Sequence, residues 1–339
     1  MGKKPIIIAE AGVNHNGDMA LAYRLIDAAA KAKVDYVKFQ TFKTASLVVK
    51  NAQKAEYQKK NANAKEESQE EMLRKLELTP QNHLDLIAYC KEKKISFLST
   101  AFDLQSIDLL VELGITLGKI PSGELTNFPF LRKMARSFPQ LILSTGMSQL
   151  YEIKDTLDVL YRFGHTPETV TVLHCNTEYP TPFEDVNLLA MNRIKDELGV
   201  QVGYSDHTLG IEVPLAATAL GATVIEKHFT LDRNMEGPDH RASLEPHELK
   251  AMVDGIERIA VSLGSPEKTV TPSEQKNKAV ARKSIVAASS IQLGDVFTEE
   301  NLTVKRPGNG INPMRWEEII GQKATRNYEQ DEPIQWLEK

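Results

Sequence analysis

Two histidines that end neighbouring apolar runs have the type and spacing to do chemistry. The runs 203–207 (GYSDH) and 224–228 (VIEKH) each close on a histidine, and the small residues of segment 211–221 between them are typical of a crossover helix. Imidazoles at the carboxyl ends of adjacent parallel strands face one pocket, and neutral imidazole is the commonest ligand for divalent transition metals. His207 and His228 are therefore candidate metal ligands, although histidines bonded only to backbone would give the same pattern.

The elements that must position these histidines alternate along the chain. Apolar runs predict strands over Pro5–Glu10, Tyr36–Gln40, Ile95–Thr100, Gly118–Ile120, Leu141–Ser144, Thr171–His174, Val202–Tyr204 and Thr223–His228. Helical spacing predicts helices over Asp18–Lys33, Thr79–Lys93, Leu104–Leu113, Phe128–Ala135, Gln149–Phe163, Asn187–Leu198, Ile211–Leu220 and Glu245–Leu263. Eight strand-then-helix units over about 260 residues fit a closed α/β barrel, the TIM (β/α)8 barrel, better than an open sheet.

The composition is that of an ordinary globular protein. The chain has 339 residues, of which 41% are hydrophobic and 26% are charged, and its net charge of −5 gives no basic surface for nucleic acid or an anionic membrane. Its two cysteines, Cys90 and Cys175, form no disulfide framework, which suits a reducing cytosol. The first residues lack the apolar run of a signal peptide or membrane span, so we expect a cytoplasmic protein.

Two regions depart from the barrel pattern. The segment 44–76 is charged and Gln-rich, and it predicts a surface excursion holding one exposed helix or a mobile loop over the barrel mouth. Glycine and proline between 264 and 273 predict a linker, and the sequence beyond it is short and β-rich. We therefore expect a barrel domain over 1–264, a linker over 265–279 that lets the next domain reach another subunit, and a small β domain over 280–339.

Polar residues end every predicted strand, whereas strand ends that only pack against a core would be apolar. Lys38 and Lys119, together with nearby hydroxyls, have the composition of a phosphate cradle; the hydroxyls belong to Thr100, Ser122, Ser144 and Ser205. No glycine fingerprint of a nucleotide site is present, so the phosphate would belong to a small metabolite. The carboxylates of Glu10 and Glu124 could orient a metal-bound water or take a proton, or simply pair with a lysine.

Nine motifs, read in order, resemble the sialic acid synthase family over essentially the whole chain. They are GVNHNG, VKFQTF, KIPSGE, LSTGM, HCNTEYPTP, GYSDHTLG, EKHFTLD, GPDHRAS and VKRPGNG. The resemblance is greatest to bacterial members that make N-acetylneuraminate, with those that make legionaminic and pseudaminic acids as near relatives. It implies a TIM barrel followed by an antifreeze-like (SAF, β-clip) domain, in a homodimer where the SAF domain of one subunit caps the barrel of the other.

The resemblance also implies a reaction. Members condense phosphoenolpyruvate with N-acetylmannosamine and water, releasing N-acetylneuraminate and phosphate by C–O cleavage. The alternative sugar is 2,4-diacetamido-2,4,6-trideoxymannose, which leads to legionaminic acid. The implied cofactor is a divalent cation, with manganese the first choice and magnesium or cobalt also compatible with two histidines and oxygen ligands.

Residue roles follow from the same motifs. His207 and His228 would bind the metal and Glu10 would lie near its water, while phosphoenolpyruvate would contact Lys38, Thr100, Lys119, Ser122, Ser144, Asn176 and Ser205. The sugar would meet Gln40, Glu124, Tyr179, Asp239 and, from the partner subunit's VKRPGNG loop, Arg306. Two positions depart from some relatives: Thr177 replaces an asparagine, although Asn176 is adjacent, and Val280 replaces an aromatic residue.

Two other classes of function stay open on the residues alone. A pyruvate lyase that forms a Schiff base on Lys119 or Lys38 would need neither metal nor phosphate. A binding module, with the barrel as a scaffold, would turn nothing over. The polar strand ends favour an enzyme over the second of these.

Overall fold

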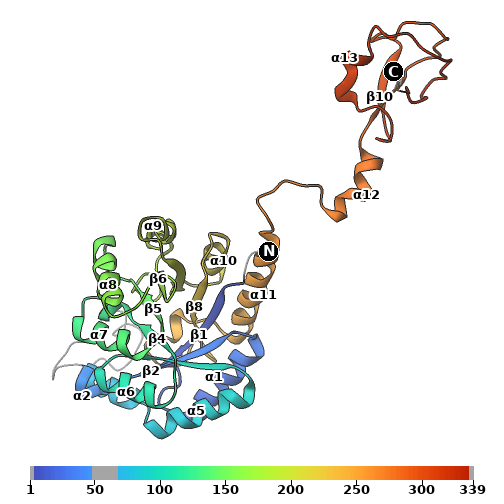
Figure 1. The fold of residues 1–339 in the computed structure, drawn as a ribbon. Helices are drawn as coiled ribbons and strands as arrows, with labels where there is room; N and C mark the ends of the chain where they lie inside the picture. Colours follow the sequence, from blue (N-terminus) through green and yellow to red (C-terminus); the bar gives the residue numbers. More distant parts are fainter. Residues whose placement is uncertain (1–3, 48–67, 336–339) are drawn as a thin grey trace. The chain divides into compact units, whose positions relative to one another are not determined.

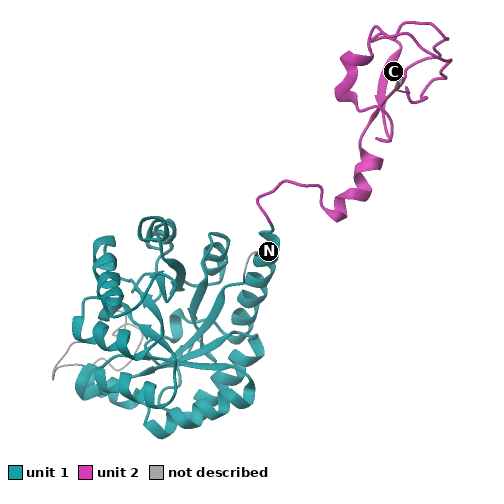
Figure 2. Cartoon of the chain, viewed as in Figure 1, with its two compact units in different colours: residues 1–264 teal, residues 265–339 magenta. Residues whose placement is uncertain are grey.

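The chain forms two compact units, Met1–Gly264 and Ser265–Lys339, which are coloured separately in Figure 2. The computed structural model describes residues 4–47 and 68–335. Most of the predicted surface excursion, residues 48–67, lies outside the described residues. Its two ends are helical, with α2 at Thr44–Leu47 and α4 at Gln69–Leu76. Among the described residues, no helix has the length and apolar character needed to cross a membrane.

Unit 1 is a ring of parallel strands with helices outside it (Figure 1). The strands are β1 Ile6–Gly12, β2 Tyr36–Thr41, β3 Ser96–Ala101, β4 Leu117–Ile120, β5 Gln140–Ser144, β6 Val170–Cys175, β7 Gln201–Asp206 and β8 Val224–His228. The main helices are α1 Met19–Ala32, α5 Pro80–Lys93, α6 Leu104–Glu112, α7 Phe128–Ser137, α8 Leu150–Arg162, α9 Leu189–Leu198, α10 Glu212–Ala219 and α11 Pro246–Ser262. The first strand pairs with the eighth, with Glu10 opposite His228, so the sheet curls into a TIM-type barrel and confirms the predicted fold class.

Alternation along the strands divides the barrel wall into two faces. Every second side chain, for example Ile7, Ala9, Val37 and Phe39, belongs to the main apolar core that includes buried helix residues such as Leu25. The intervening positions form a smaller apolar cluster: Ile8, Leu98, Ile142, Leu173 and Val224. This cluster fills the lower part of the barrel, and the residues two positions further along each strand therefore lie above it.

Strands β7 and β8 approach each other closely because β7 contains a glycine. A Cβ atom added to Gly203 would lie 2.4 Å from the carbonyl oxygen of Val224 and 2.6 Å from Leu173 Cδ2. Any larger side chain at position 203 would push the two strands apart. The spacing of the two histidine-bearing strand ends thus depends on this small residue.

Unit 2 has its own apolar core. Helix α12 (Pro272–Ala281) precedes the antiparallel pair β9 (Ser284–Ala287) and β10 (Leu302–Lys305), and helix α13 follows at Trp316–Ile319. The buried core residues are Ile285, Ala287, Ile291, Phe297, Leu302, Ile319, Ala324, Tyr328 and Ile334. Most of α12 falls on the residues that the sequence pattern assigned to a linker, because Pro272 and the Thr271–Glu274 capping box start a helix there.

Candidate active site

A polar layer lies directly above the apolar layer inside the barrel. On each strand the residue two positions beyond an inward-facing one is polar or a thiol: Glu10, Lys38, Thr100, Lys119, Ser144, Cys175, Ser205 and Glu226. These side chains line a cavity of about 410 Å³ at the carboxyl ends of the strands. His207, His228 and Tyr179 line the same cavity. The barrel thus gathers most of the predicted site residues in one place.

Two lysines and two glutamates form a buried chain of charges in this cavity. Lys38 Nζ lies 2.8 Å from Glu10 Oε2 and 3.6 Å from Glu226 Oε2, and Lys119 Nζ lies 3.7 Å from Glu226 Oε1. Lys38 also donates to Thr100 Oγ1 at 2.9 Å, Lys119 donates to Ser144 Oγ, and Ser205 Oγ donates to Glu226 Oε1 at 3.0 Å. Glu226 therefore lies between the two lysines.

Burial and these charges shift the pKa values in different directions. Burial raises the pKa of Glu10 to about 7, against the opposing charge of Lys38. Burial also acts to raise the pKa of Glu226, but the charges on Lys119 and Lys38 outweigh it and lower this pKa to about 2. The pKa of Lys119 is lowered by burial, whereas the charges on Glu10 and Glu226 raise the pKa of Lys38 despite its burial. Glu226 is thus ionised throughout the neutral pH range, whereas a pKa of about 7 lets Glu10 exchange its proton within that range.

The two histidine rings lie side by side at the cavity wall. Their centroids are 5.3 Å apart, and the Tyr179 ring lies 4.1 Å from His207 and 5.5 Å from His228. His207 Nδ1 lies 2.5 Å from the backbone carbonyl oxygen of Asn176, so this nitrogen must donate and Nε2 keeps its lone pair. Burial lowers the pKa of His207 to about 4 and, together with His207, lowers the pKa of His228. Both rings are therefore neutral at physiological pH.

These histidines fit an exchangeable divalent cation. His228 Nδ1 is buried without a hydrogen-bond partner among the described residues, and Glu10 Oε2 and Glu226 Oε2 lack hydrogen bonds of acceptable geometry in the same part of the chain. Within residues 4–47 and 68–335, no cluster of three or more His, Cys, Asp and Glu side chains could hold a metal ion. Two imidazoles alone leave coordination positions for water and substrate, which a catalytic ion needs and a closed structural site does not offer.

A turn after β5 brings a backbone amide to Ser122, which lines the cavity. Gly146 N donates to Ser122 Oγ at 2.9 Å, and a Cβ on Gly146 would lie 2.5 Å from Thr177 Cγ2. Only glycine permits this approach. Ser122 is thereby held beside Lys119 and Ser144 at the cavity wall, where a bound anion would meet it.

A second cavity, of about 400 Å³, adjoins the first and shares four lining residues with it: Gln40, Phe102, Tyr179 and His228. Asp239 also lines it, with Oδ2 3.9 Å from His228 Nδ1, and burial raises the pKa of Asp239 to about 6. Three residues predicted to meet the sugar, Gln40, Tyr179 and Asp239, thus lie around this second cavity.

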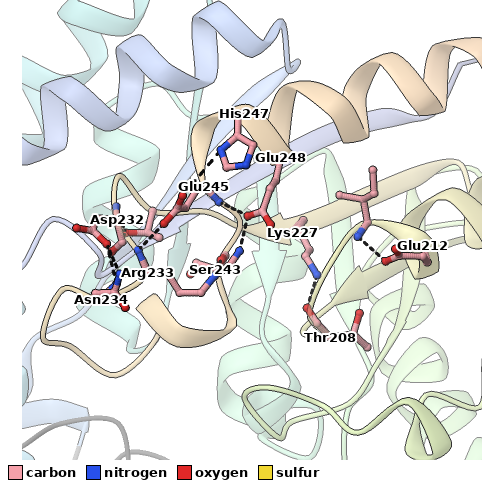
Figure 3. A network of polar contacts seen from close by, with 12 residues as sticks. Thr208, Glu212, Lys227, Asp232, Arg233, Asn234, Ser243, Glu245, His247 and Glu248 are labelled. Atoms are coloured by element: carbon pink, nitrogen blue, oxygen red, sulfur yellow. Dashed lines mark hydrogen bonds and ion pairs between the residues drawn. The ribbon is translucent and has the colours of Figure 1, made fainter.

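Hydrogen bonds and an ion pair hold the loop that carries Asp239 from two sides. Arg233 Nε donates to the Ser243 carbonyl at 3.2 Å, and its guanidinium pairs with Glu248 at the start of α11 (Figure 3). Ser243 Oγ donates to the Asp239 carbonyl at 2.7 Å and accepts from Asn14 Nδ2 at 2.9 Å. These contacts connect the loop to α11 and to Asn14, which follows β1.

Three predicted site residues lie elsewhere or act differently. Glu124 lines a separate cavity with Asp103 and accepts from Asn127 Nδ2 at 2.6 Å. The side chain of Asn176 accepts from the Glu178 amide at 2.7 Å, so Asn176 meets the site through its carbonyl group instead. Arg306 belongs to unit 2, where its Nε donates to the Ala281 carbonyl at 3.0 Å.

Sequence reasoning missed Glu226. Glu226 is part of VIEKH, the run that the sequence analysis interprets only through its final histidine. Strand periodicity contained the signal: Glu226 is two positions before His228 and must face the same side.

A buried ion pair between Lys227 of β8 and Asp206 of β7 connects the two strands beside the histidines in sequence. Lys227 Nζ lies 2.5 Å from Asp206 Oδ2 and 2.5 Å from the Thr208 carbonyl oxygen, the latter contact being drawn in Figure 3. Both charged side chains have no exposed surface. Thr208 Oγ1 also donates to Asp206 at 3.0 Å. Because Asp206 and Thr208 flank His207 in sequence, Lys227 fixes the position of His207 relative to β8.

Comparisons with known proteins give concordant matches. A sequence profile of the NeuB family matches residues 25–268, and that of the SAF domain matches residues 282–338. The N,N'-diacetyllegionaminic acid synthase of Campylobacter jejuni subsp. jejuni serotype O:2 is 54% identical, covering 98% of this chain and 99% of that protein. The enzyme of the same name from Legionella pneumophila subsp. pneumophila is 45% identical, covering 97% and 93%. The N-acetylneuraminic acid synthetase of Leptospira borgpetersenii serovar Hardjo-bovis, known from a crystal structure, has 35% sequence identity and a TM-score of 0.70. The match covers 81% of this chain and 90% of that one.

Proposed function

The chain belongs to the NeuB family, and we propose that it condenses phosphoenolpyruvate with 2,4-diacetamido-2,4,6-trideoxymannose and water to give N,N'-diacetyllegionaminic acid and phosphate. The observation that carries the proposal is the single cavity in which two lysines, two glutamates and two neutral histidines meet at the carboxyl ends of the barrel strands. Such a cavity can hold an anion and a cation side by side.

The choice of sugar rests on the relatives. Two of them, at 54% and 45% identity, are named N,N'-diacetyllegionaminic acid synthases, whereas the N-acetylneuraminic acid synthetase is 35% identical. The comparisons therefore favour the alternative sugar of the sequence analysis over its first choice, N-acetylmannosamine.

The two lysines would bind phosphoenolpyruvate. Lys38 and Lys119 provide two ammonium groups, and Thr100, Ser144 and Ser205 already hydrogen-bond to members of the charge chain. An arriving phosphate or carboxylate would take over bonds now made by Glu10 and Glu226, at positions where little solvent competes. Ser122 and the Gly146 turn would close the anion site.

The histidines would hold the cation. A divalent ion bound there, for which manganese is the expected choice, would supply Lewis-acid polarisation of the aldehyde of the open-chain sugar. His207 is oriented for this by the Asn176 carbonyl, and Tyr179 packs against both rings and restricts their movement. These contacts fix the two rings, so a cation bound by them would hold the aldehyde beside the phosphoenolpyruvate site.

The proposed reaction forms one carbon–carbon bond and breaks the carbon–oxygen bond to phosphate. A bond would form between C3 of phosphoenolpyruvate and C1 of the sugar, and the aldehyde oxygen would become a hydroxyl by taking a proton. Water would add at C2, the C2–O bond to phosphate would break, and C2 would become the ketone carbon as the second proton of the water leaves with the phosphate. Glu10, which lies beside Lys38 in the cavity, would take the proton of the added water. Lys38 and Lys119 would stabilise the departing phosphate.

Other predicted roles remain proposals. The protein would form a homodimer in which Arg306 of one subunit reaches the acylated sugar in the other. Glu124 would also contact the sugar. Their tests are the solution mass of the protein and the effect of Arg306→Ala on the KM for each substrate.

The proposed function is tested by phosphate release from phosphoenolpyruvate. We expect release with 2,4-diacetamido-2,4,6-trideoxymannose, weaker release with N-acetylmannosamine, and loss of both after EDTA treatment, with recovery on adding Mn²⁺. Release that persists without metal, or covalent trapping of pyruvate on a lysine by borohydride, would refute the mechanism and favour a Schiff-base lyase.

A further inference from the structure

The second cavity has an unusual wall. A small apolar cluster, separate from both barrel cores, is made of Val13, Phe42, Met72, Leu76, Leu47, Leu73 and Phe102. All seven side chains of this cluster line the second cavity. We call these seven residues the apolar wall. Apolar side chains that line a cavity next to catalytic groups make contact with whatever occupies it.

Polar contacts at both ends of α4 hold the apolar wall in place. Ser68 Oγ caps the helix by accepting from the Glu71 amide at 3.2 Å, and the Glu71 carboxylate accepts from the Ser68 amide at 2.9 Å. After the helix, Glu77 accepts from Lys43 Nζ at 2.9 Å and from the Thr44 amide at 3.0 Å, which ties the end of α4 to the start of α2. These contacts hold α4 and the start of α2 in place, and the apolar wall therefore has a defined shape.

Most polar residues of the second cavity lie where it joins the first, whereas Gln69, at the start of α4, lines the second cavity alone. Gln40, Tyr179 and His228 line both cavities, and Asp239 is near His228. A sugar whose C1 reacts beside His228 would therefore extend its far end, C4 to C6, into the second cavity towards the apolar wall.

We propose that the apolar wall selects the sugar by the substituents on C4 and C6. This inference rests on the proposed function. N-acetylmannosamine carries hydroxyls on C4 and C6, whereas 2,4-diacetamido-2,4,6-trideoxymannose carries an acetamido group and a methyl group there. A hydroxyl against the wall loses its hydrogen bonds to water and finds no partner among the seven wall side chains, while the C6 methyl and the methyl of the acetamido group gain from burial. The wall thus favours the second sugar, by about 10- to 100-fold for the exchange of the C6 hydroxyl for a methyl group.

Leu73 offers the sharpest test, because it is only partly buried and yet lines the cavity. Leu73→Gln places an amide of similar size in the wall. We expect the ratio of kcat/KM for the diacetamido sugar over N-acetylmannosamine to fall about 10-fold or more, with the KM for phosphoenolpyruvate unchanged. Leu47→Gln, at another partly buried wall position, should lower the same ratio.

Two further variants and a third sugar serve as controls for this test. Leu73→Met keeps an apolar side chain and should retain the preference. Leu84→Gln makes the same change at a leucine that is 49% exposed on α5, and it should leave the ratio as it is in the parent. A third sugar, 2-acetamido-2,6-dideoxymannose, has the C6 methyl but a C4 hydroxyl, and should react at an intermediate rate.

The outcomes separate the two proposals. If the parent prefers the diacetamido sugar and both glutamine variants keep that preference, the assignment of the wall is overturned while the proposed function stands. If the parent releases no phosphate with any of the sugars, or prefers N-acetylmannosamine, the proposed function fails and the wall assignment fails with it.

Discussion

Replacing Lys227 with methionine should destabilise the barrel strongly. The Lys227 and Asp206 side chains are both fully buried, and Lys227 Nζ also bonds to the Thr208 carbonyl. Lys227→Met leaves the Asp206 charge without its cation in a site that water does not reach. Breaking a buried pair from one side costs about 3–5 kcal/mol of unfolding free energy. For a unit of this size that lowers the unfolding midpoint by roughly 6–20 °C.

Removing both charges together should restore most of this loss. In Lys227→Met/Asp206→Asn no buried charge is left unpaired, and the amide oxygen that replaces the carboxylate can still accept from Thr208. The double variant should therefore be more stable than Lys227→Met alone. Lys250→Met serves as the control, because Lys250 and Asp254 pair on the exposed face of α11 and such pairs contribute less than about 1 kcal/mol.

The assay must report on the barrel. Both tryptophans, at positions 316 and 336, lie in unit 2, so helical circular dichroism is the suitable signal for urea or thermal unfolding. Mn²⁺ binding, measured by calorimetry, should weaken by about 10- to 100-fold in Lys227→Met, because the pair holds the residues on either side of His207. A single variant within about 1 kcal/mol of the parent, or a double variant no more stable than the single, would refute this reasoning.

Three further predictions follow from the site and the strands that carry it. His207→Ala and His228→Ala should each abolish turnover and detectable Mn²⁺ binding while leaving the circular dichroism spectrum intact; full activity in either would remove the proposed cation site. Glu226→Gln takes away the carboxylate between Lys38 and Lys119, and kcat/KM for phosphoenolpyruvate should fall by about 100-fold or more if the ionised group positions both lysines, an effect that steady-state kinetics would show. Gly203→Ala should destabilise unit 1 by about 1–3 kcal/mol in urea unfolding, because its Cβ would meet the Val224 carbonyl oxygen; an unchanged midpoint would mean that β7 and β8 can separate freely.

Much of the barrel was predictable because its strands are short apolar runs at regular intervals. All eight predicted strands overlap the observed ones, and polar residues at or just after the end of each run line one cavity at the carboxyl ends. Lys38 and Lys119 could be grouped in this way although they are separated by two strand-and-helix units. The barrel architecture converts regular sequence spacing into proximity.

The rest depended on contacts that spacing does not encode. Glu124 follows β4 as Ser122 does, but its side chain turns to Asn127 and lines a different cavity. The role of the Asn176 carbonyl could not be read from a side-chain type, because a backbone group orients His207. The apolar wall joins residues of α2, α4 and the loops after β1, β2 and β3, and only tertiary packing brings these together.

The charges inside this barrel are best explained by a ligand. A TIM barrel is usually filled by layers of branched apolar side chains, and the layer below the site here follows that rule with Ile8, Leu98 and Val224. Directly above it, Glu10, Lys38, Glu226 and Lys119 replace what could have been a second apolar layer. A buried ion network of this kind is seldom more stable than well-packed apolar residues of the same volume. The network therefore gives the fold no advantage that would explain it, whereas alternating charges that an arriving anion and cation can rearrange are what a phosphoenolpyruvate-dependent reaction requires.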